Sequence, residues 1–399
     1  MQATPNSHDA TGLARTAVAV LGMHRSGTSA LTWLVGRMGA ALPGDAMAAT
    51  GENARGYFES VGVARAGERL LRAAKSSWFD PRPLELDRLP DATRAAHRAD
   101  LGGAIAAAFG DAPVIALKDP RQCRFVPFLR ETLAERGYAM RAALMLRGAD
   151  AVAASLDARD GTTLACARLL WLRHMLDAER DTRGLPRAIV RYDRLLADWR
   201  AEASRLAPLL DRTEWAPPEG FGADVDAFLD RGLHHHEGGA GATDFAELDT
   251  LVRTAEAAFE ALAEEDGEGA RAALDRVADR LREAPWITDD VVHDELRHRR
   301  APRSEVSPPP PPTVAPAAER ARARESGDGN LAETARTIEL SGLFDRDFYL
   351  ATYPDVGESG LDPIVHYVTI GAAEGRNPSR LFDTAYYARQ MLRRAGGTA

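Results

Sequence analysis

The chain has 399 residues, with 50 Lys and Arg against 59 Asp and Glu, and a formal net charge of −9. This acidic balance argues against a nucleic-acid partner, which would require a basic surface. There are only two cysteines, and no apolar run reaches membrane-spanning length. We therefore expect neither a disulfide framework nor a transmembrane segment, and a cytoplasmic location.

Residues 14–290 alternate short strand-like apolar runs with helical stretches. That alternation predicts an α/β fold in which helices cover both faces of a central parallel sheet, a three-layer α/β/α arrangement. Two stretches, Asp91–Phe109 and Thr162–Asp181, have the length and spacing of long amphipathic helices. We expect this part of the chain to form one domain.

The most informative segment joins a strand to a helix near the amino terminus. An apolar run, Ala17–Leu21, leads into a glycine-bounded loop, Gly22–Gly27, and Thr28–Gly39 then carries apolar residues at helical spacing. Free backbone N–H groups and the helix dipole point at one place in such an arrangement, so the segment predicts a P-loop-like phosphate site. Thr28 stands where a nucleotide triphosphatase needs its lysine, and the positive charge is at Arg25 instead. ATP or GTP hydrolysis is therefore disfavoured, and a tight connection without a ligand is the alternative.

Three later strand ends also carry polar side chains. They are Lys118-Asp119-Pro120-Arg121 after Pro113–Leu117, Arg147 after Met140–Leu146 with Ser155 eight residues later, and Tyr192 after Arg187–Arg191. A guanidinium at a strand end and a hydroxyl two helical turns further on can converge on one phosphate. Taken singly, these features have plainer interpretations: a solvated turn, a solvated helix face and a core tyrosine. Their succession after the first loop favours a second anion site.

Together these segments resemble the bacterial, carbohydrate-type sulfotransferases that use PAPS (3′-phosphoadenosine 5′-phosphosulfate), and the resemblance covers residues 14–290. It implies that Arg147 and Ser155 hold the 3′-phosphate and that Tyr192 lies near the adenine. It also implies that Lys118 and Arg121 meet the sulfuryl group or an anionic acceptor, with Asp119 orienting one of them. The residues that it assigns to the 5′-phosphosulfate are Arg25, Ser26, Gly27, Thr28 and Ser29.

Sulfuryl transfer to a hydroxyl needs a base for the proton and cations for the charge that develops on the leaving phosphate. Arg25 is the expected cation, and the resemblance points to an acidic residue after the first helix, Glu59 or Glu52, as the base. Glu59 stands beside Tyr57-Phe58, so partial desolvation is expected to raise its pKa. For either glutamate the alternative is an ordinary carboxylate at a helix start. The chemistry needs no metal, and the sequence contains no metal-ligand spacing.

Beyond residue 300 the chain changes character twice. Residues 300–335 are rich in Pro, Ala and Arg, with Pro308–Pro312 inside them, which predicts an extended linker. Residues 336–399 are aromatic and turn-rich, and Leu343–Leu350 recurs imperfectly as Leu381–Ala388 after 38 residues. This small helical, turn-rich module resembles repeats found beside glycosyltransferases of bacterial surface polysaccharides. Its aromatic side chains are expected to form a core.

The expected function is therefore transfer of a sulfuryl group from PAPS to a hydroxyl of a saccharide, glycolipid or polysaccharide precursor. The resemblance of the module implies the glycan acceptor and a glycan-assembly protein as partner. Two alternatives remain open. A P-loop small-molecule kinase would share the first loop, but the lysine and a clear Mg²⁺-binding pair are missing. A non-catalytic nucleotide-binding adaptor would keep Arg147 and Ser155 and tolerate loss of both glutamates.

Overall fold

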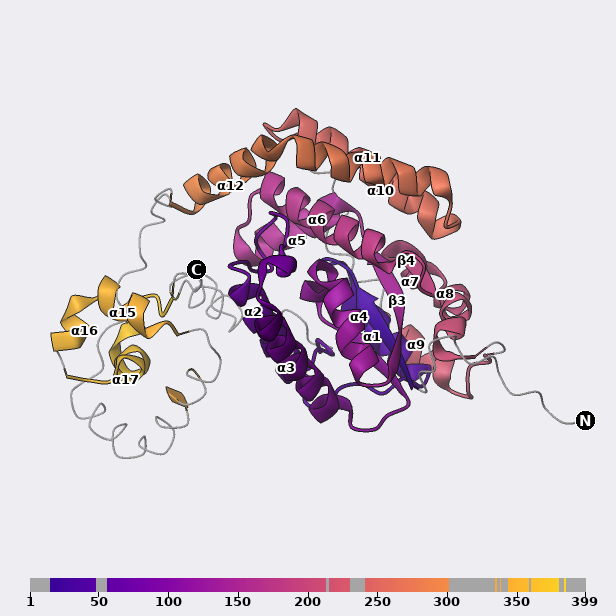
Figure 1. Cartoon of the computed structure of the whole chain (residues 1–399), viewed down its shortest axis with the longest axis horizontal. Helices are drawn as coiled ribbons and strands as arrows, with labels where there is room; N and C mark the ends of the chain where they lie inside the picture. Colours follow the sequence, from indigo (N-terminus) through magenta and orange to yellow (C-terminus); the bar gives the residue numbers. More distant parts are fainter. Residues whose placement is uncertain are drawn as a thin grey trace, which may run out of the picture. The chain divides into compact units, whose positions relative to one another are not determined.

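The computed structural model describes residues 15–47, 56–212, 215–229 and 241–300, and, further along the chain, 334–335, 338, 344–358, 360–379 and 384. The chain divides into two compact units, Met1–Ala301 and Pro302–Ala399 (Figure 1). In the described residues, the first unit contains a parallel sheet with its helices, and the second unit is built from short helices.

Within the described residues, four parallel strands form the sheet, in the order β2-β1-β3-β4. The strands are β1 (Arg15–Leu21), β2 (Val114–Lys118), β3 (Tyr138–Leu146) and β4 (Arg187–Arg191). They are apolar runs buried almost throughout, as is typical of a parallel sheet covered on both faces. β1 lies between β2 and β3, and Ala17 pairs with Ile115 on one side and Met140 on the other. The carboxyl ends of these three strands therefore meet at one edge of the sheet.

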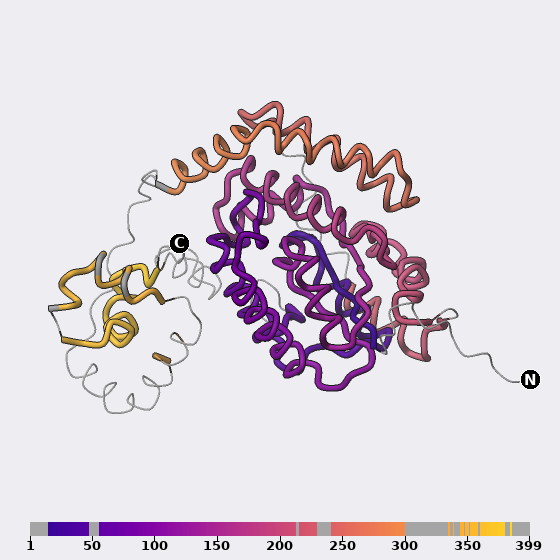
Figure 2. The backbone as a smooth tube through the Cα atoms, in the orientation of Figure 1, coloured from indigo at the N-terminus to yellow at the C-terminus, as the bar shows by residue number. Residues whose placement is uncertain are grey.

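Alternate residues of β1 point to opposite faces of the sheet, and each face has its own hydrophobic cluster. Ala17, Ala19 and Leu21 belong to one cluster, and Val18 and Val20 belong to the other. The first cluster contains residues of the helices within 61–182 and 246–300, and the second contains residues of the helices within 28–37 and 192–228. Figure 2 shows helices on both sides of the strands, and the predicted three-layer α/β/α fold is confirmed.

The helices of the first unit follow the order of the chain. They are α1 (Thr28–Arg37), α2 (Val61–Ala73), α3 (Asp91–Phe109), α4 (Val126–Glu135), α5 (Ala149–Asp160), α6 (Leu164–Thr182), α7 (Tyr192–Ala197), α8 (Trp199–Leu206), α9 (Phe221–Phe228), α10 (Ala246–Glu264), α11 (Glu268–Glu283) and α12 (Pro285–Arg300). In the described part of this unit, the short 3-10 turns η1 (Leu86–Arg88), η2 (Pro120–Arg124) and η3 (Ala207–Leu210) lie between them.

Helix α6 differs from the amphipathic helix expected over Thr162–Asp181. Nearly all of its residues are buried, because α5 packs on one side while α10 and α12 pass over the other (Figure 1). Its polar side chains are paired inside the protein instead of facing water: Arg168, for example, contacts Asp150 at 2.6 Å and Asp249 at 2.7 Å. The expectation of a solvated face was therefore wrong for this helix.

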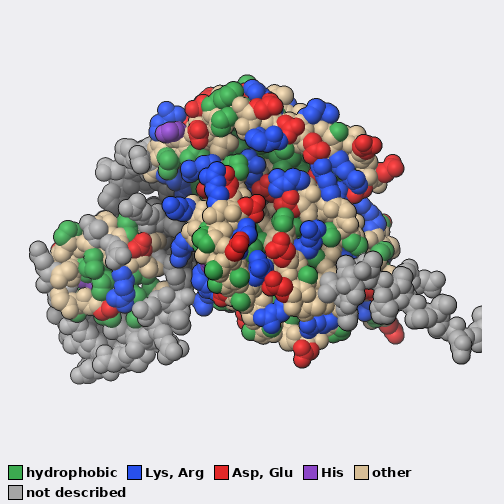
Figure 3. Space-filling model, viewed as in Figure 1, with side chains coloured by type: hydrophobic (Ala, Val, Ile, Leu, Met, Phe, Trp, Pro, Cys, Tyr) green, Lys and Arg blue, Asp and Glu red, His purple; other side chains and the backbone are tan. Residues whose placement is uncertain are grey.

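The surface of the first unit carries both signs of charge. On the face shown in Figure 3, Lys and Arg side chains are interspersed with Asp and Glu over α10 and α11. Arg183 lies 2.8 Å from Asp275, and Arg280 lies 2.5 Å from Glu247. Within the described ranges, no helix has both the length and the apolar character needed to cross a bilayer.

The second unit has an aromatic core. Its helices are α15 (Arg346–Thr352), α16 (Pro354–Glu358) and α17 (Pro363–His366), followed by a π-helical turn, Tyr367–Gly371. Tyr349 and Tyr367 are buried and lie edge to face, with ring centroids 5.9 Å apart. The prediction that aromatics form a core here is confirmed. The second copy of the repeat, Leu381–Ala388, lies outside the described residues except for Thr384, whose Oγ1 is 2.9 Å from the Tyr367 hydroxyl.

Both cysteines are predicted to be chemically inert in the folded protein. Cys123 and Cys166 are free thiols buried in the core, and burial raises the pKa of Cys123 to about 12 and also raises the pKa of Cys166. Since the thiolate is the reactive species, neither should react with Ellman's reagent at pH 8, whereas both should react after unfolding in guanidinium. Rapid release of a thionitrobenzoate equivalent from the native protein would contradict this packing.

Candidate functional site

The loop between β1 and α1 needs glycine at both ends. Gly22 has φ 152°, its N–H lies 3.1 Å from Cys123 Sγ, and a Cβ there would come within 2.9 Å of the Met145 carbonyl oxygen. Gly27 has φ 93°, and a Cβ there would overlap the Tyr192 ring. A larger residue at either position would push the loop away from the sheet edge, so the backbone conformation depends on these two glycines.

The amino terminus of α1 has neither a side-chain cap nor an acidic residue in its first turn. Gly27 precedes the helix without contributing a side chain. The first N–H groups of a helix have no partner within the helix, and its dipole places partial positive charge at that end. The predicted succession of strand, glycine-bounded loop and helix is present, and phosphate binding at this loop stays a prediction.

The hydroxyl side chains of the loop have different partners. Ser26 is fully buried, and its hydroxyl donates to the Met23 carbonyl oxygen at 2.6 Å, so this hydroxyl shapes the loop. Thr28 is also buried. The Ser29 hydroxyl lies 3.3 Å from the Tyr57 carbonyl oxygen and accepts a hydrogen bond from Lys118 at 3.2 Å. Ser29 therefore connects the loop to the end of β2.

Arg25 is joined to the second predicted anion site. Its Nε donates to Ser155 Oγ at 2.8 Å, and its carbonyl oxygen accepts from Arg147 Nη1 at 2.9 Å. Arg25 has φ 69°, a left-handed conformation that costs a non-glycine residue about 1–2 kcal/mol. The structure thus brings Arg25 together with Arg147 and Ser155, which follow it by 122 and 130 residues.

Arg147 is held between the loop and the core. Its guanidinium carbon lies 5.0 Å from the centroid of the Tyr192 ring, and its own carbonyl oxygen accepts from the Trp171 indole N–H at 2.9 Å. Burial lowers the pKa of Arg147, and the nearby charge of Arg25 lowers it further. No carboxylate in the described residues pairs with Arg147. An anionic ligand between the two guanidiniums would relieve their repulsion and satisfy the Arg147 fork.

Lys118 and Glu59 form a buried ion pair beside the loop. Their side chains are 3% and 8% exposed, and Lys118 Nζ donates to Glu59 Oε1 and to the Tyr57 carbonyl oxygen at 3.1 Å. Burial raises the pKa of Glu59, and Asp119 contributes in the same direction while Lys118 opposes it. The expected rise in the pKa of Glu59 is therefore confirmed. Glu59 lies just before Ser60, the N-cap of α2, so it is not part of that helix.

The turn after Lys118 is buried rather than solvated. Asp119 is 1% exposed, and its Oδ1 accepts from the Arg121 backbone N–H and from Arg121 Nη1, both at 3.0 Å. Arg121 also pairs with Glu68 at 3.1 Å and lies 3.9 Å from Glu59. Asp119 therefore orients Arg121, as one of the two interpretations of this turn expected.

Two further points concern the second candidate base and metal binding. Glu52, the second candidate base, lies outside the described residues. Among the residues that the structure does describe, no group of three or more His, Cys, Asp and Glu side chains is placed to hold a metal ion.

One residue at this site carried no signal in the sequence. Trp78, in the connection between α2 and η1, packs against His24 of the loop with ring centroids 4.6 Å apart. Burial lowers the pKa of His24 well below its usual value, and the neighbouring arginines act in the same direction, so the imidazole is neutral at pH 7. A lone tryptophan in an irregular segment has no spacing that would identify its partner in advance.

Removal of the lysine from the buried pair should make stability depend on pH. Lys118→Met leaves the Glu59 carboxylate buried without its cation, so the free energy of unfolding at pH 7 should fall by about 3–5 kcal/mol. The folded state binds the Glu59 proton more tightly than the unfolded state. Part of the loss should therefore be regained as the pH falls from neutral through the raised pKa of Glu59. Urea denaturation between pH 5 and 8 measures this.

The double variant Lys118→Met/Glu59→Gln is the control, because it has no carboxyl to protonate. It should show no recovery of stability, relative to the wild type, as the pH falls. A loss in Lys118→Met that is equal at every pH would show that Glu59 does not carry the buried charge.

No family model matches the chain, and no curated protein matches it. Among solved structures, the chain is similar to the sulfotransferase domain from the Synechococcus PCC 7002 olefin synthase, at 15% identity and a TM-score of 0.38, over 64% of this chain and 98% of that domain. It is also similar to the sulfotransferase domain from the curacin biosynthetic pathway, at 14% identity and a TM-score of 0.31, over 51% of this chain and 76% of that one. The function of this chain is therefore inferred from the geometry of its site.

Proposed function

We propose that this protein is a cytoplasmic sulfotransferase that moves the sulfuryl group of PAPS to a hydroxyl of a saccharide or a glycolipid or polysaccharide precursor. The observation that carries the proposal is the convergence of Arg25, Arg147 and Ser155 at a phosphate loop in which Thr28 replaces the lysine of a nucleotide triphosphatase. Two adjacent guanidiniums suit a ligand with two separate anionic groups, such as the 5′-phosphosulfate and the 3′-phosphate of PAPS. The free thiols support a reducing compartment.

The donor would be held by groups that are already in place. The N–H groups at the start of α1 and the Arg25 side chain would bind the 5′-phosphosulfate. Arg147 and Ser155 would bind the 3′-phosphate, with the Ser155 hydroxyl exchanging its bond to Arg25 for one to the ligand. The Tyr192 ring, which lies against Gly27 and beneath Arg147, would contact the adenine.

Proton transfer and charge stabilisation are coupled through the Lys118–Glu59 pair. The acceptor oxygen would bond to sulfur while the bond from sulfur to the bridging phosphate oxygen breaks, and the electron pair of that bond would remain on the phosphate. Glu59 would take the hydroxyl proton, which its raised pKa favours. Protonation of Glu59 removes the negative charge paired with Lys118. The ammonium is then released to stabilise the leaving phosphate when its charge develops.

The second unit is the feature that supports a saccharide as the acceptor. Its sequence resembles repeats found beside glycosyltransferases of bacterial surface polysaccharides, and Tyr349 and Tyr367 lie in its core, which leaves them unavailable as a sugar platform. We therefore place this unit in a docking role, towards a glycan-assembly protein, and place acceptor binding in the first unit.

Calorimetric titration with PAP, the desulfated product of PAPS, tests the donor site directly. Micromolar binding without metal, with weak binding of Mg-ATP, is expected. Arg147→Ala should weaken PAP binding by about 2–5 kcal/mol, the usual effect of removing one partner from a desolvated charge pair. The PAP affinity of Arg147→Lys should lie between those of the wild type and Arg147→Ala, since lysine keeps the positive charge but loses the forked pair of N–H donors.

Arg130→Ala is the matched control, because Arg130 is exposed on α4 and should not affect PAP binding. Preference for Mg-ATP over PAP would overturn the proposal in favour of a kinase. An unchanged PAP affinity in Arg147→Ala would remove Arg147 from the donor site.

Replacement of the proposed base separates binding from catalysis. Glu59→Gln should leave PAP affinity near that of the wild type while turnover falls by about 10²–10⁴-fold, the usual contribution of a general base. Glu68→Gln, which changes a carboxylate that also contacts Arg121, should retain most activity. Full turnover in Glu59→Gln would transfer the role to Glu52, and PAP binding without any turnover in the wild type would favour a nucleotide-binding adaptor.

A further inference from the structure

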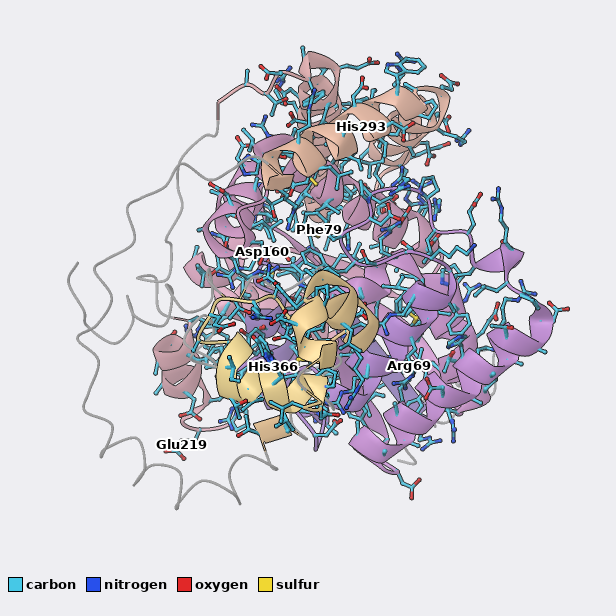
Figure 4. The ribbon with its side chains drawn as sticks, turned by 90° about the vertical axis from the view of Figure 1, so that its left-hand side faces the viewer. Arg69, Phe79, Asp160, Glu219, His293 and His366 are labelled. Carbon is cyan, nitrogen blue, oxygen red and sulfur yellow. The ribbon has the colours of Figure 1, made fainter. Side chains whose placement is uncertain are left out.

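Trp78 lies beside the phosphate loop on the side where α5 ends. Its ring packs against His24, and the guanidinium carbon of Arg159, in the last turn of α5, is 5.5 Å from its centroid. The same helix carries Ser155, which contacts Arg25. Figure 4 labels Phe79 and Asp160, the sequence neighbours of Trp78 and Arg159, and shows both near the middle of the face that it presents. Trp78, His24 and Arg159 together are called the Trp78 surface below.

Buried arginines fix the segment that carries Trp78. Arg124 has a fully buried side chain, pairs with Asp177 at 3.0 Å, and donates to the carbonyl oxygens of Asp80 and Arg82, both at 2.6 Å. Arg173 donates to the carbonyl oxygen of residue 81, between them, at 3.0 Å. Three consecutive carbonyl groups are thus held by two guanidiniums from η2 and α6, a costly arrangement that positions an otherwise irregular segment.

Phe79 adds a second anchor for the same segment. Its ring meets Trp78 edge to face, with centroids 5.1 Å apart, and the guanidinium carbon of Arg299 on α12 lies 4.5 Å from its centroid. Trp78 is half-buried, and the residues next to it in sequence are held in place. A fixed, partly exposed indole at the edge of a phosphate loop is suited to contact a ligand.

The Trp78 surface offers hydrogen-bonding groups in addition to apolar area. In the part of the chain that the structure describes, the Trp78 indole N–H donates to no residue, and His24 Nε2 is buried without a partner. The indole N–H is a donor only, and when it is buried it usually finds a hydrogen-bond partner. An indole edge beside a neutral imidazole fits a ring that presents both C–H groups and hydroxyls.

The cations nearby are already compensated. Arg159 bonds to Asp160 at 2.8 Å and 2.5 Å, Lys118 pairs with Glu59, and Arg121 pairs with both Asp119 and Glu68. A charged acceptor would therefore meet carboxylates as well as cations on this side of the loop. This pairing of cations with carboxylates favours an uncharged acceptor over the anionic acceptor that the Lys118–Arg121 segment suggested.

We infer that the Trp78 surface binds the acceptor, and that the acceptor presents an uncharged saccharide ring to Trp78. This inference rests on the proposed function and names the side of the site, and the kind of sugar, that the proposed function leaves open.

Steady-state kinetics with PAPS and a panel of sugars test the inference. The panel comprises methyl β-glucoside, N-acetylglucosamine and cellobiose as neutral probes, with glucuronate as the charged comparison. Trp78→Ala should raise KM for the neutral sugars about tenfold or more, since an aromatic contact is lost, with PAP affinity unchanged. Trp78→Phe should restore part of the loss. Trp286→Ala, which removes an exposed tryptophan on α12, should change neither value.

The outcomes distinguish failure of the proposed function from failure of the acceptor surface. Absence of PAP binding in the wild type overturns the proposed function itself. If PAP binds and a sugar of the panel is sulfated, two results overturn the acceptor surface alone: equal KM values in wild type and Trp78→Ala, or preference for glucuronate. Where Trp78→Ala fails to fold, Trp78→Phe serves instead, with its PAP affinity as the check on folding and an unchanged KM as the contradicting result.

Discussion

The parallel hydrogen bonding of β1 with both of its neighbours is the constraint on which the site depends. β1 pairs with β2 through Val20 and Lys118 and with β3 through Leu21 and Leu144. All three strands therefore end at the same edge of the sheet. The phosphate loop leaves one strand, Lys118 ends the next, and Arg147 follows the third. Had β2 been antiparallel, its lysine would lie at the opposite edge, beyond reach of Ser29.

The same edge concentrates conformational and electrostatic costs. Arg25 and Phe58 adopt left-handed backbone conformations, with φ of 69° and 57°, although neither is glycine. Phe58 directly precedes Glu59, and Arg25 lies within the loop, so two of the four non-glycine residues with positive φ in the described chain stand beside the charged groups. Buried ion pairs contribute little to stability compared with apolar packing. The rest of the fold, with apolar clusters on both faces of the sheet, compensates for these costs.

Local patterns predicted the parts of the structure that depend on local geometry. Strand ends, the glycine-bounded loop and the eight-residue spacing of Arg147 and Ser155 are short-range features, and the structure brings these residues together. Pairings between distant segments were not predictable. Lys118 and Glu59 are 59 residues apart, and nothing in either segment indicates the other. Likewise, the burial of α6 depends on α10 and α12, which follow it by more than sixty residues.

The direction of individual side chains was the other feature that the sequence could not predict. Ser26 belongs to the loop by sequence, but its hydroxyl turns back to the Met23 carbonyl oxygen. Trp78 contacts His24 from a segment in which Arg124 and Arg173 hold the carbonyl groups of residues 80–82. Such placements result from the packing of several elements at once, and the sequence of any one element does not contain them.

The hydrogen bond between Arg25 and Ser155 has a consequence for the way a donor would enter. In the structure Arg25 donates a hydrogen bond to Ser155, although each side chain is assigned to a different end of the proposed donor. A nucleotide with both anionic ends would replace the shared bond with one bond at each end. A nucleotide with a single anionic end would break the same bond and satisfy only one partner. The two anionic ends of the donor would thereby bind cooperatively, because neither end gains its full binding energy without the other.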